Sequence, residues 1–171
     1  MVEFTHFDET GNARMVDVSE KDVTTRVATA TGSILVSPEI FDAIRGKKVK
    51  KGDVLTVAQV AGIMGCKRTS ELIPMCHILM LTNAKVTFSM DAERQRITAI
   101  CTVKTDGKTG VEMEALTGVT TALLTVYDMC KAIDKRMVLT DIHLVEKSGG
   151  KSGDFHFDEE SGHGAERESG K

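Results

Sequence analysis

Residues 110–133, GVEMEALTGVTTALLTVYDMCKAI, decide the fold. Their apolar side chains recur at intervals of three and four residues, the spacing that gathers side chains on one face of an α-helix. The positions that set this spacing are Leu116, Val119, Leu123, Val126, Cys130 and Ile133. The segment therefore predicts one long helix with a buried face, from Gly110 to about Ile133.

Extended segments flank this helix on both sides. Residues 24–36 are rich in β-branched side chains, and residues 84–92 and 95–105 form two further candidate strands. The Glu-Arg pair between those two is consistent with a hairpin, although it is poor turn chemistry. Residues 137–146 alternate like a final strand, and residues 15–19, MVDVS, also predict extended structure.

Two shorter helices are predicted between the first and second long strands. Ser37 offers an N-cap and Pro38 suits the first helical position, which indicates a helix over residues 38–45. Asp53 offers a second N-cap, and the apolar segment that follows it, residues 54–65, predicts a buried helix rich in small residues.

The resulting order, βα(α)ββαβ, predicts a ferredoxin-like α+β fold. In this split βαβ arrangement the helices pack on one face of an antiparallel sheet. The other face then needs cover, which residues 15–19 or a second subunit could supply. We therefore expect an oligomer.

Composition predicts one domain with an acidic tail. The chain has 171 residues and 41% hydrophobic content, enough for one self-sufficient core. We expect a catalytic domain over residues 1–155 and a disordered tail over 156–171. Removing residues 152–171 changes the net charge from −3 to +1. A near-neutral body argues against a general nucleic-acid binder but permits a cationic pocket for a small anion.

The cysteines indicate neither a disulfide framework nor a metal site. They form no CxxC pair, and the sequence shows no secretory signal and no long apolar span. The four cysteines are Cys66, Cys76, Cys101 and Cys130. We therefore expect reduced thiols, a cytoplasmic location and no membrane partner.

Two glycine-lysine motifs look like phosphate-binding loops but fail the pattern. A Walker A loop needs a glycine five residues before the GK glycine, and Thr102 and Val145 occupy those positions. A weaker expectation remains, in which Thr109 caps the long helix and its N-terminal amides receive an anion. Glu112 and Glu114 complicate this reading, because first-turn acids stabilise a helix through the same dipole.

The same strand order also describes RNA-recognition domains, which stack bases on aromatic residues of the sheet. The first strand and the RITAICTVKT strand carry no aromatic residue, and the one tyrosine, Tyr127, lies on the predicted helix. This argues against an RNA-binding role.

The charged residues near the end of the long helix allow two interpretations. Asp128 and Lys131 are three residues apart, so alone they predict an exposed ion pair on the helix surface. Glu114 and Asp128, however, lie on nearly one face and about 21 Å apart at ~1.5 Å per residue. If both serve one active site, they must come from two chains, for example across a two-fold axis.

Six motifs in order give the chain a close resemblance to the cyclic pyranopterin monophosphate synthase family, also known as molybdenum cofactor biosynthesis protein C. The resemblance covers residues 5–155. The motifs are FTHFDETGNARMVDVS, KKGDV, AGIMGCKRTSELIPMCHILML, KTGVEMEALT, TVYDMCKAIDK and KSGGKSGDF.

This resemblance implies a homohexamer, built as a trimer of dimers with active sites at subunit interfaces. It implies a nucleotide-derived substrate, (8S)-3′,8-cyclo-7,8-dihydroguanosine 5′-triphosphate. The products would be cyclic pyranopterin monophosphate and diphosphate, in molybdenum cofactor biosynthesis. It implies no tightly held metal or redox cofactor, while magnesium accompanying the triphosphate stays open. The alternative is a non-catalytic nucleotide-binding module of the same fold.

The resemblance also assigns residues. Lys51, Asp128 and Lys131 would perform the proton transfers of ring opening and closure. Arg26, Lys51 and Lys147 would stabilise the phosphoryl group and the departing diphosphate. The substrate-contact residues would be Met75, Cys76, His77, Glu112, Met113 and Glu114. Because adjacent side chains diverge, the Cys76-His77 pair is not expected to act as nucleophile and base.

Overall fold

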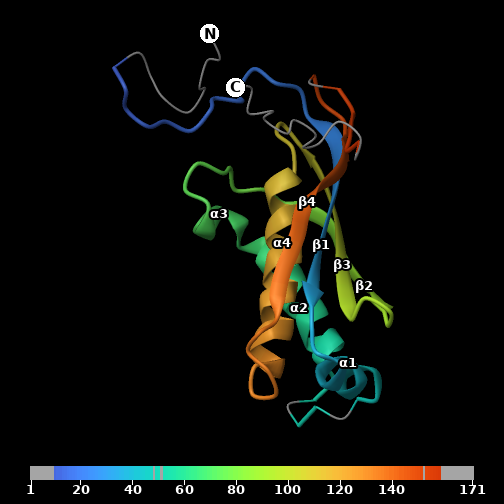
Figure 1. The fold of residues 1–171 in the computed structure, drawn as a ribbon. Helices are drawn as coiled ribbons and strands as arrows, with labels where there is room; N and C mark the ends of the chain where they lie inside the picture. Colours follow the sequence, from blue (N-terminus) through green and yellow to red (C-terminus); the bar gives the residue numbers. More distant parts are fainter. Residues whose placement is uncertain (1–9, 48, 51, 152, 159–171) are drawn as a thin grey trace, which may run out of the picture.

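The computed structural model describes residues 10–158, apart from positions 48, 51 and 152. Within that range the chain forms four helices and five strands (Figure 1). In chain order these are β1 (Thr24–Leu35), α1 (Pro38–Arg45), α2 (Val54–Lys67), α3 (Thr69–Leu72), β2 (Leu81–Asp91), β3 (Arg96–Gly107), α4 (Glu112–Cys130), β4 (Val138–Ser148) and β5 (Phe155–His156).

The strands form one antiparallel sheet in the order β2-β3-β1-β4-β5. Strand β1 is central, because it pairs with β3 on one side and with β4 on the other. Helices α2 and α4 lie side by side against this sheet (Figure 1). This is the ferredoxin-like α+β arrangement that the sequence predicts.

Small residues let α2 and α4 approach each other and the sheet closely. A Cβ atom added to Gly62 would lie 2.9 Å from the carbonyl oxygen of Gly118. One added to Gly118 would lie 2.5 Å from the sulfur of Cys66 and 2.7 Å from that of Cys101. The core between helices and sheet contains Ala28, Ala30, Val86, Ala99, Val103, Val119, Leu123 and Val126.

Two predicted helix caps are confirmed, and one is wrong. The Ser37 side chain accepts from the Ile40 amide, and the Asp53 side chain accepts from the Thr56 amide. Helix α4, however, has Val111 at its N-cap position without a side-chain hydrogen bond. Thr109 does not cap it, because the helix begins only at Glu112, three positions further along.

Helix α4 also ends earlier than its apolar spacing predicts. Its last helical residue is Cys130, and residues 131–133 form a turn in which the Ile133 amide donates to the Cys130 carbonyl. The apolar spacing continues through this turn, so it could not mark the end of the helix.

The turn between β2 and β3 explains how the predicted hairpin forms around a Glu-Arg pair. The Asp91 carboxylate accepts from the backbone amides of Glu93 and Arg94, at 3.0 and 3.1 Å. Gln95 then takes the left-handed conformation with φ 51°, which reverses the chain. The turn chemistry therefore comes from the residues that flank the pair.

Residues 15–19, for which the sequence predicts extended structure, do not join the sheet. They have no regular sheet pairing, and the Val16 carbonyl oxygen instead lies 2.8 Å from His77 Nε2. Two short elements, α3 and β5, were not predicted. Strand β5 includes His156, which pairs with Glu146, while residues 159–171 of the expected tail lie outside the described residues.

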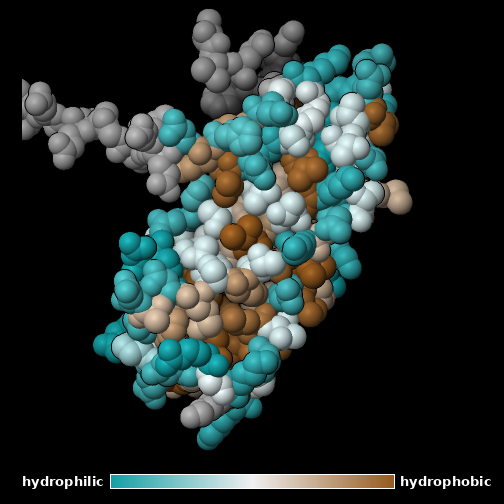
Figure 2. Space-filling model, turned by 90° about the vertical axis from the view of Figure 1, so that its right-hand side faces the viewer, coloured by the Kyte–Doolittle hydropathy of each residue, from teal (hydrophilic) through white to brown (hydrophobic). Residues whose placement is uncertain are grey.

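The sheet face opposite α2 and α4 is lined by hydroxyl groups. Thr29 and Thr102 hydrogen-bond across β1 and β3 at 3.1 Å, and Ser33 and Thr98 do so at 2.9 Å. Figure 2 shows one side of the molecule, where near-neutral and hydrophobic surface fills the middle and hydrophilic residues border it.

Candidate active site

The predicted substrate-contact residues meet at one cavity of about 380 Å³ beside the start of α4. The segment after α3 and the segment that leads into the first turn of α4 both line it, together with Val16, Val18 and Lys21 of the N-terminal segment. The predicted residues that line it are Met75, Cys76, His77, Glu112, Met113 and Glu114.

Glu114 is the buried acid of this cavity. Only 4% of its surface is exposed, and burial is the main cause that raises its pKa to about 7, with a smaller contribution from Glu112. A carboxyl group with that pKa can hold or release a proton near neutral pH. Glu114 can therefore donate to or accept from a polar ligand.

Cys76 and His77 occupy the opposite wall. Burial, and next the charge of Glu114, raise the pKa of the Cys76 thiol, which disfavours a thiolate nucleophile. The Val16 carbonyl can only accept a hydrogen bond, so His77 donates to it from Nε2. His77 therefore links the N-terminal segment to the cavity.

Arg26 and Lys147 line an adjoining cavity of about 160 Å³. Arg26 is 8% exposed, and its guanidinium donates to two backbone carbonyls, that of Gly107 at 2.9 Å and that of Lys108 at 3.2 Å. Lys147 forms an ion pair with Glu112 at 3.3 Å. Since Glu112 lines both cavities, it marks the boundary between an acidic part and a cationic part of the site.

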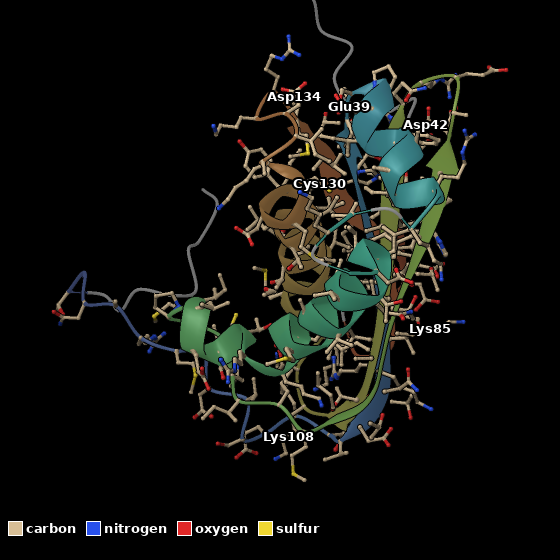
Figure 3. All side chains as sticks on the ribbon, turned by 90° about the horizontal axis from the view of Figure 1, so that it is seen from below. Glu39, Asp42, Lys85, Lys108, Cys130 and Asp134 are labelled. Atoms are coloured by element: carbon tan, nitrogen blue, oxygen red, sulfur yellow. The ribbon has the colours of Figure 1, made fainter. Side chains whose placement is uncertain are left out.

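Asp128 and Lys131 lie at the other end of α4. The Lys131 amine donates to Asp128 Oδ1 at 2.6 Å, and this hydrogen bond raises the pKa of Lys131. Figure 1 shows the start and the end of α4 at opposite ends of the molecule. Figure 3, seen from below, shows Lys108, which precedes α4, well apart from Cys130, the last residue of the helix. One chain therefore does not bring Asp128 and Lys131 to Glu114.

Lys51 lies outside the described residues. The described end of α1, at Arg45, and the described start of α2, at Val54, precede and follow it in the sequence.

Lys21 is a site residue that sequence reasoning missed. It lines both of the cavities above and a third one beside them. No spacing rule connects a lysine in an irregular N-terminal segment to α4, so the sequence carried no signal for it.

Among residues 10–158, omitting the three undescribed positions, no group of three or more His, Cys, Asp or Glu side chains could hold a metal ion. No helix in the described part of the chain is long and apolar enough to cross a membrane.

Comparison with known proteins decides the family. Residues 15–150 match the MoaC family. The chain belongs to the MoaC family. It is 59% identical over 153 residues to the cyclic pyranopterin monophosphate synthase of Clostridium perfringens (strain SM101 / Type A), covering 90% of this chain and 97% of that protein.

Two further MoaC relatives carry the same name. The Desulfitobacterium hafniense protein is 60% identical over 154 residues, which covers 90% of this chain and 94% of the relative. The Thermoanaerobacter sp. (strain X514) protein is 60% identical over 149 residues, covering 87% of this chain and 94% of the relative. The family resemblance read from the six sequence motifs is therefore confirmed.

Proposed function

We propose that this chain is a cyclic pyranopterin monophosphate synthase, a lyase of molybdenum cofactor biosynthesis. It converts (8S)-3′,8-cyclo-7,8-dihydroguanosine 5′-triphosphate to cyclic pyranopterin monophosphate and diphosphate. The observation that carries this proposal is the pair of adjoining cavities, one centred on Glu114 and one on Arg26 and Lys147. Together they match a ligand with an N–H-rich ring system at one end and phosphates at the other.

Each cavity suits one part of this substrate. Glu114 can accept from the guanidine-like edge of the ring system, supported by the polar groups of Cys76 and His77. Arg26 can bind phosphate oxygens in a bidentate manner, and Lys147 adds a compact positive charge where diphosphate departs. The paired position of Lys147 implies that substrate phosphate competes with Glu112 for its amine.

The proton-transfer residues come, in this proposal, from a second chain. Asp128, Lys131 and Lys51 of one subunit would complete the cavity at Glu114 of another, because α4 places Glu114 and Asp128 of one chain about 21 Å apart at ~1.5 Å per residue. Large apolar side chains support such contacts, since Val57, Val60 and Met64 of α2 and Leu124 of α4 are 45%, 54%, 47% and 54% exposed. We propose a homohexamer, a trimer of dimers.

We propose a reaction without a resident metal or redox cofactor, in which any magnesium arrives with the triphosphate. The proposed location is the cytoplasm, because none of the four cysteines, all of them among the described residues, forms a disulfide, which suits a reducing compartment.

Anaerobic incubation of the purified protein with the 3′,8-cyclised dihydro-GTP tests this function. Mass spectrometry should show diphosphate and cyclic pyranopterin monophosphate in equal amounts. A Lys51→Ala variant should lose nearly all turnover. If the protein binds the substrate but returns it unchanged, a non-catalytic nucleotide-binding role replaces the proposal.

A further inference from the structure

After β4 the chain folds back on itself at the edge of the sheet. The turn lies between Ser148 and Phe155, and β5 then pairs with the end of β4 in the antiparallel sense. The Phe157 amide extends this pairing, since it donates to the Val145 carbonyl at 2.7 Å. We call residues 145–157 the C-terminal hairpin. It lies at the same end of the molecule as the start of α4 (Figure 1).

The turn of the C-terminal hairpin packs against β1 and forms part of the wall of the candidate site. Ser148 and Gly149 line the cavity of about 160 Å³. A Cβ atom added to Gly149 would collide with the Thr25 carbonyl oxygen, and one added to Gly150 would collide with Arg26 Nη1. The position of the hairpin therefore determines the space around the Arg26 side chain.

The hydrogen bonds inside this turn are weak. The Gly149 amide donates to the Asp154 carboxylate at 3.3 Å, and the Gly153 amide donates to the Gly150 carbonyl at 3.4 Å, both longer than a usual N–H···O bond. Gly149, Gly150 and Gly153 all have positive φ values, and glycine gives a chain that is not held in place much conformational freedom. The turn therefore depends on the strands that close it.

Phe157 closes the hairpin with a side-chain contact in addition to its backbone hydrogen bond. Its ring lies against that of His143 on β4, with ring centroids 4.3 Å apart and planes inclined by 39°. Offset and tilted aromatic pairs of this kind stabilise a fold beyond the area that they bury. His143 is itself held in place, because its Nδ1 donates to the Asp141 carbonyl at 2.8 Å.

A second side-chain contact between β4 and β5 is weaker. His156 and Glu146 approach to 3.7 Å, but their side chains are 76% and 49% exposed, and exposed ion pairs contribute little to stability. Strand β5 itself has two residues, too few to stay paired through backbone hydrogen bonds alone. The contact between Phe157 and His143 is therefore the part of the hairpin that keeps β5 on β4.

We propose that Phe157 is a positioning residue for the candidate site. By packing on His143 it keeps β5 paired with β4, and the paired hairpin keeps Gly149 and Gly150 against β1 beside Arg26. Phe157 is not among the described residues that line the cavities, so it acts through the turn and not on the substrate. This inference rests on the proposed function for its effect on substrate binding.

Hydrogen exchange of the full-length protein, followed by mass spectrometry, tests the effect on the hairpin. Phe157→Ala should speed exchange of the backbone amides of residues 145–157 roughly fivefold, and should raise the KM for the 3′,8-cyclised dihydro-GTP by a similar factor, as expected for the loss of one aromatic contact. The kcat should stay near that of wild type, because the proposed proton-transfer residues lie elsewhere. Phe157→Tyr keeps the ring and should restore both values.

His143→Ala removes the other half of the same contact. It should act like Phe157→Ala, and the double variant should show no larger effect than either single variant, because each one already abolishes the contact. The control is Ile100→Ala on β3, a strand that pairs with neither β4 nor β5. Ile100 and Phe157 are both 40% exposed. The control should keep hairpin exchange and KM within about twofold of wild type.

The proposal is wrong if Phe157→Ala leaves hairpin exchange at the wild-type rate, or if exchange speeds up while KM stays unchanged. A fall in kcat at unchanged KM would also contradict it, since Phe157 would then affect the chemistry and not binding. If wild-type protein binds the substrate but returns it unchanged, the proposed function fails. The calorimetric affinity for the same compound then replaces KM, and a roughly fivefold loss in Phe157→Ala would retain the positioning role.

Discussion

Glu114 and Asp128 lie on one helix, α4, near its beginning and near its end. Their separation is about 21 Å along the axis at ~1.5 Å per residue, and the two ends of α4 lie at opposite ends of the molecule. A nucleotide-sized ring system cannot contact both residues of one chain. If both serve the reaction, each active site combines the Glu114 end of one subunit with the Asp128 end of another.

Lys131→Ala should separate a functional ion pair from a structural one. Lys131 pairs with Asp128 at 2.6 Å, and both side chains are about half exposed, so their interaction contributes little to stability. We expect the variant to unfold at nearly the wild-type temperature while losing most turnover. Thermal unfolding and product formation measure the two effects.

Arg45→Ala is the matched control for Lys131→Ala. Arg45 and Asp42 form the same i,i+3 ion pair at 2.6 Å, but on α1. Its loss should leave both stability and turnover close to wild type. Equal turnover in the two variants would mean that Lys131 takes no part in the reaction.

Glu114 should make stability depend on pH. Its pKa is raised from 4.5 to about 7, so the folded protein retains a proton that the unfolded chain releases at lower pH. Glu114 therefore does not destabilise the fold below about pH 4.5. As the pH rises through 7, it lowers the free energy of unfolding by up to about 3 kcal/mol. Glu114→Gln, which carries no charge, should lack this loss.

Unfolding temperatures of wild type and Glu114→Gln, measured from pH 4.5 to 8.5, check this prediction. The variant should gain stability relative to wild type as pH rises. Glu39→Gln, an exposed first-turn carboxylate of α1, provides the reference for losing one surface charge. If the unfolding temperatures of wild type and Glu114→Gln depend on pH in the same way, folding does not raise the pKa of Glu114.

Gly150→Ala should impair phosphate binding as well as stability. Gly150 and Gly153 have positive φ values of +84° and +71°, so alanine at either position costs about 1 kcal/mol in backbone strain. Only at Gly150 would the added methyl group also collide with Arg26, whereas Gly153 has open space around it. We expect both variants to lose stability. Only Gly150→Ala should raise the KM for the 3′,8-cyclised dihydro-GTP.

Gly153→Ala thus controls for strain in the measurement of KM. A Gly150→Ala variant with wild-type KM would show that the loop can yield without moving the Arg26 guanidinium.

The order of the helices and strands could be predicted from the sequence because each has a local signal. Ser37 and Asp53 cap their helices as expected, and the apolar spacing of α4 identifies its buried face. The errors occur where the deciding contact is distant in sequence. Residues 15–19 follow a strand-like pattern, yet Val16 contacts His77, sixty-one positions away.

The proposed substrate-contact residues could be predicted only through the family motifs. The sequence places Met75 to His77 and Met113-Glu114 far apart, and the fold brings them to one cavity. The raised pKa of Glu114 arises from burial between α4 and its surroundings, which no local pattern encodes. Lys21 as a cavity-lining residue and the close approach of Gly150 to Arg26 likewise required the structure.

Mixing two inactive variants tests the shared active site most directly. Glu114→Ala and Asp128→Ala subunits, each nearly inactive alone, are dissociated, combined and reassembled, and native mass spectrometry confirms mixed oligomers. Some sites then receive an intact Glu114 end from one chain and an intact Asp128 end from the other, so we predict partial recovery of turnover. Confirmed mixed oligomers without any recovery would contradict a site built from two chains.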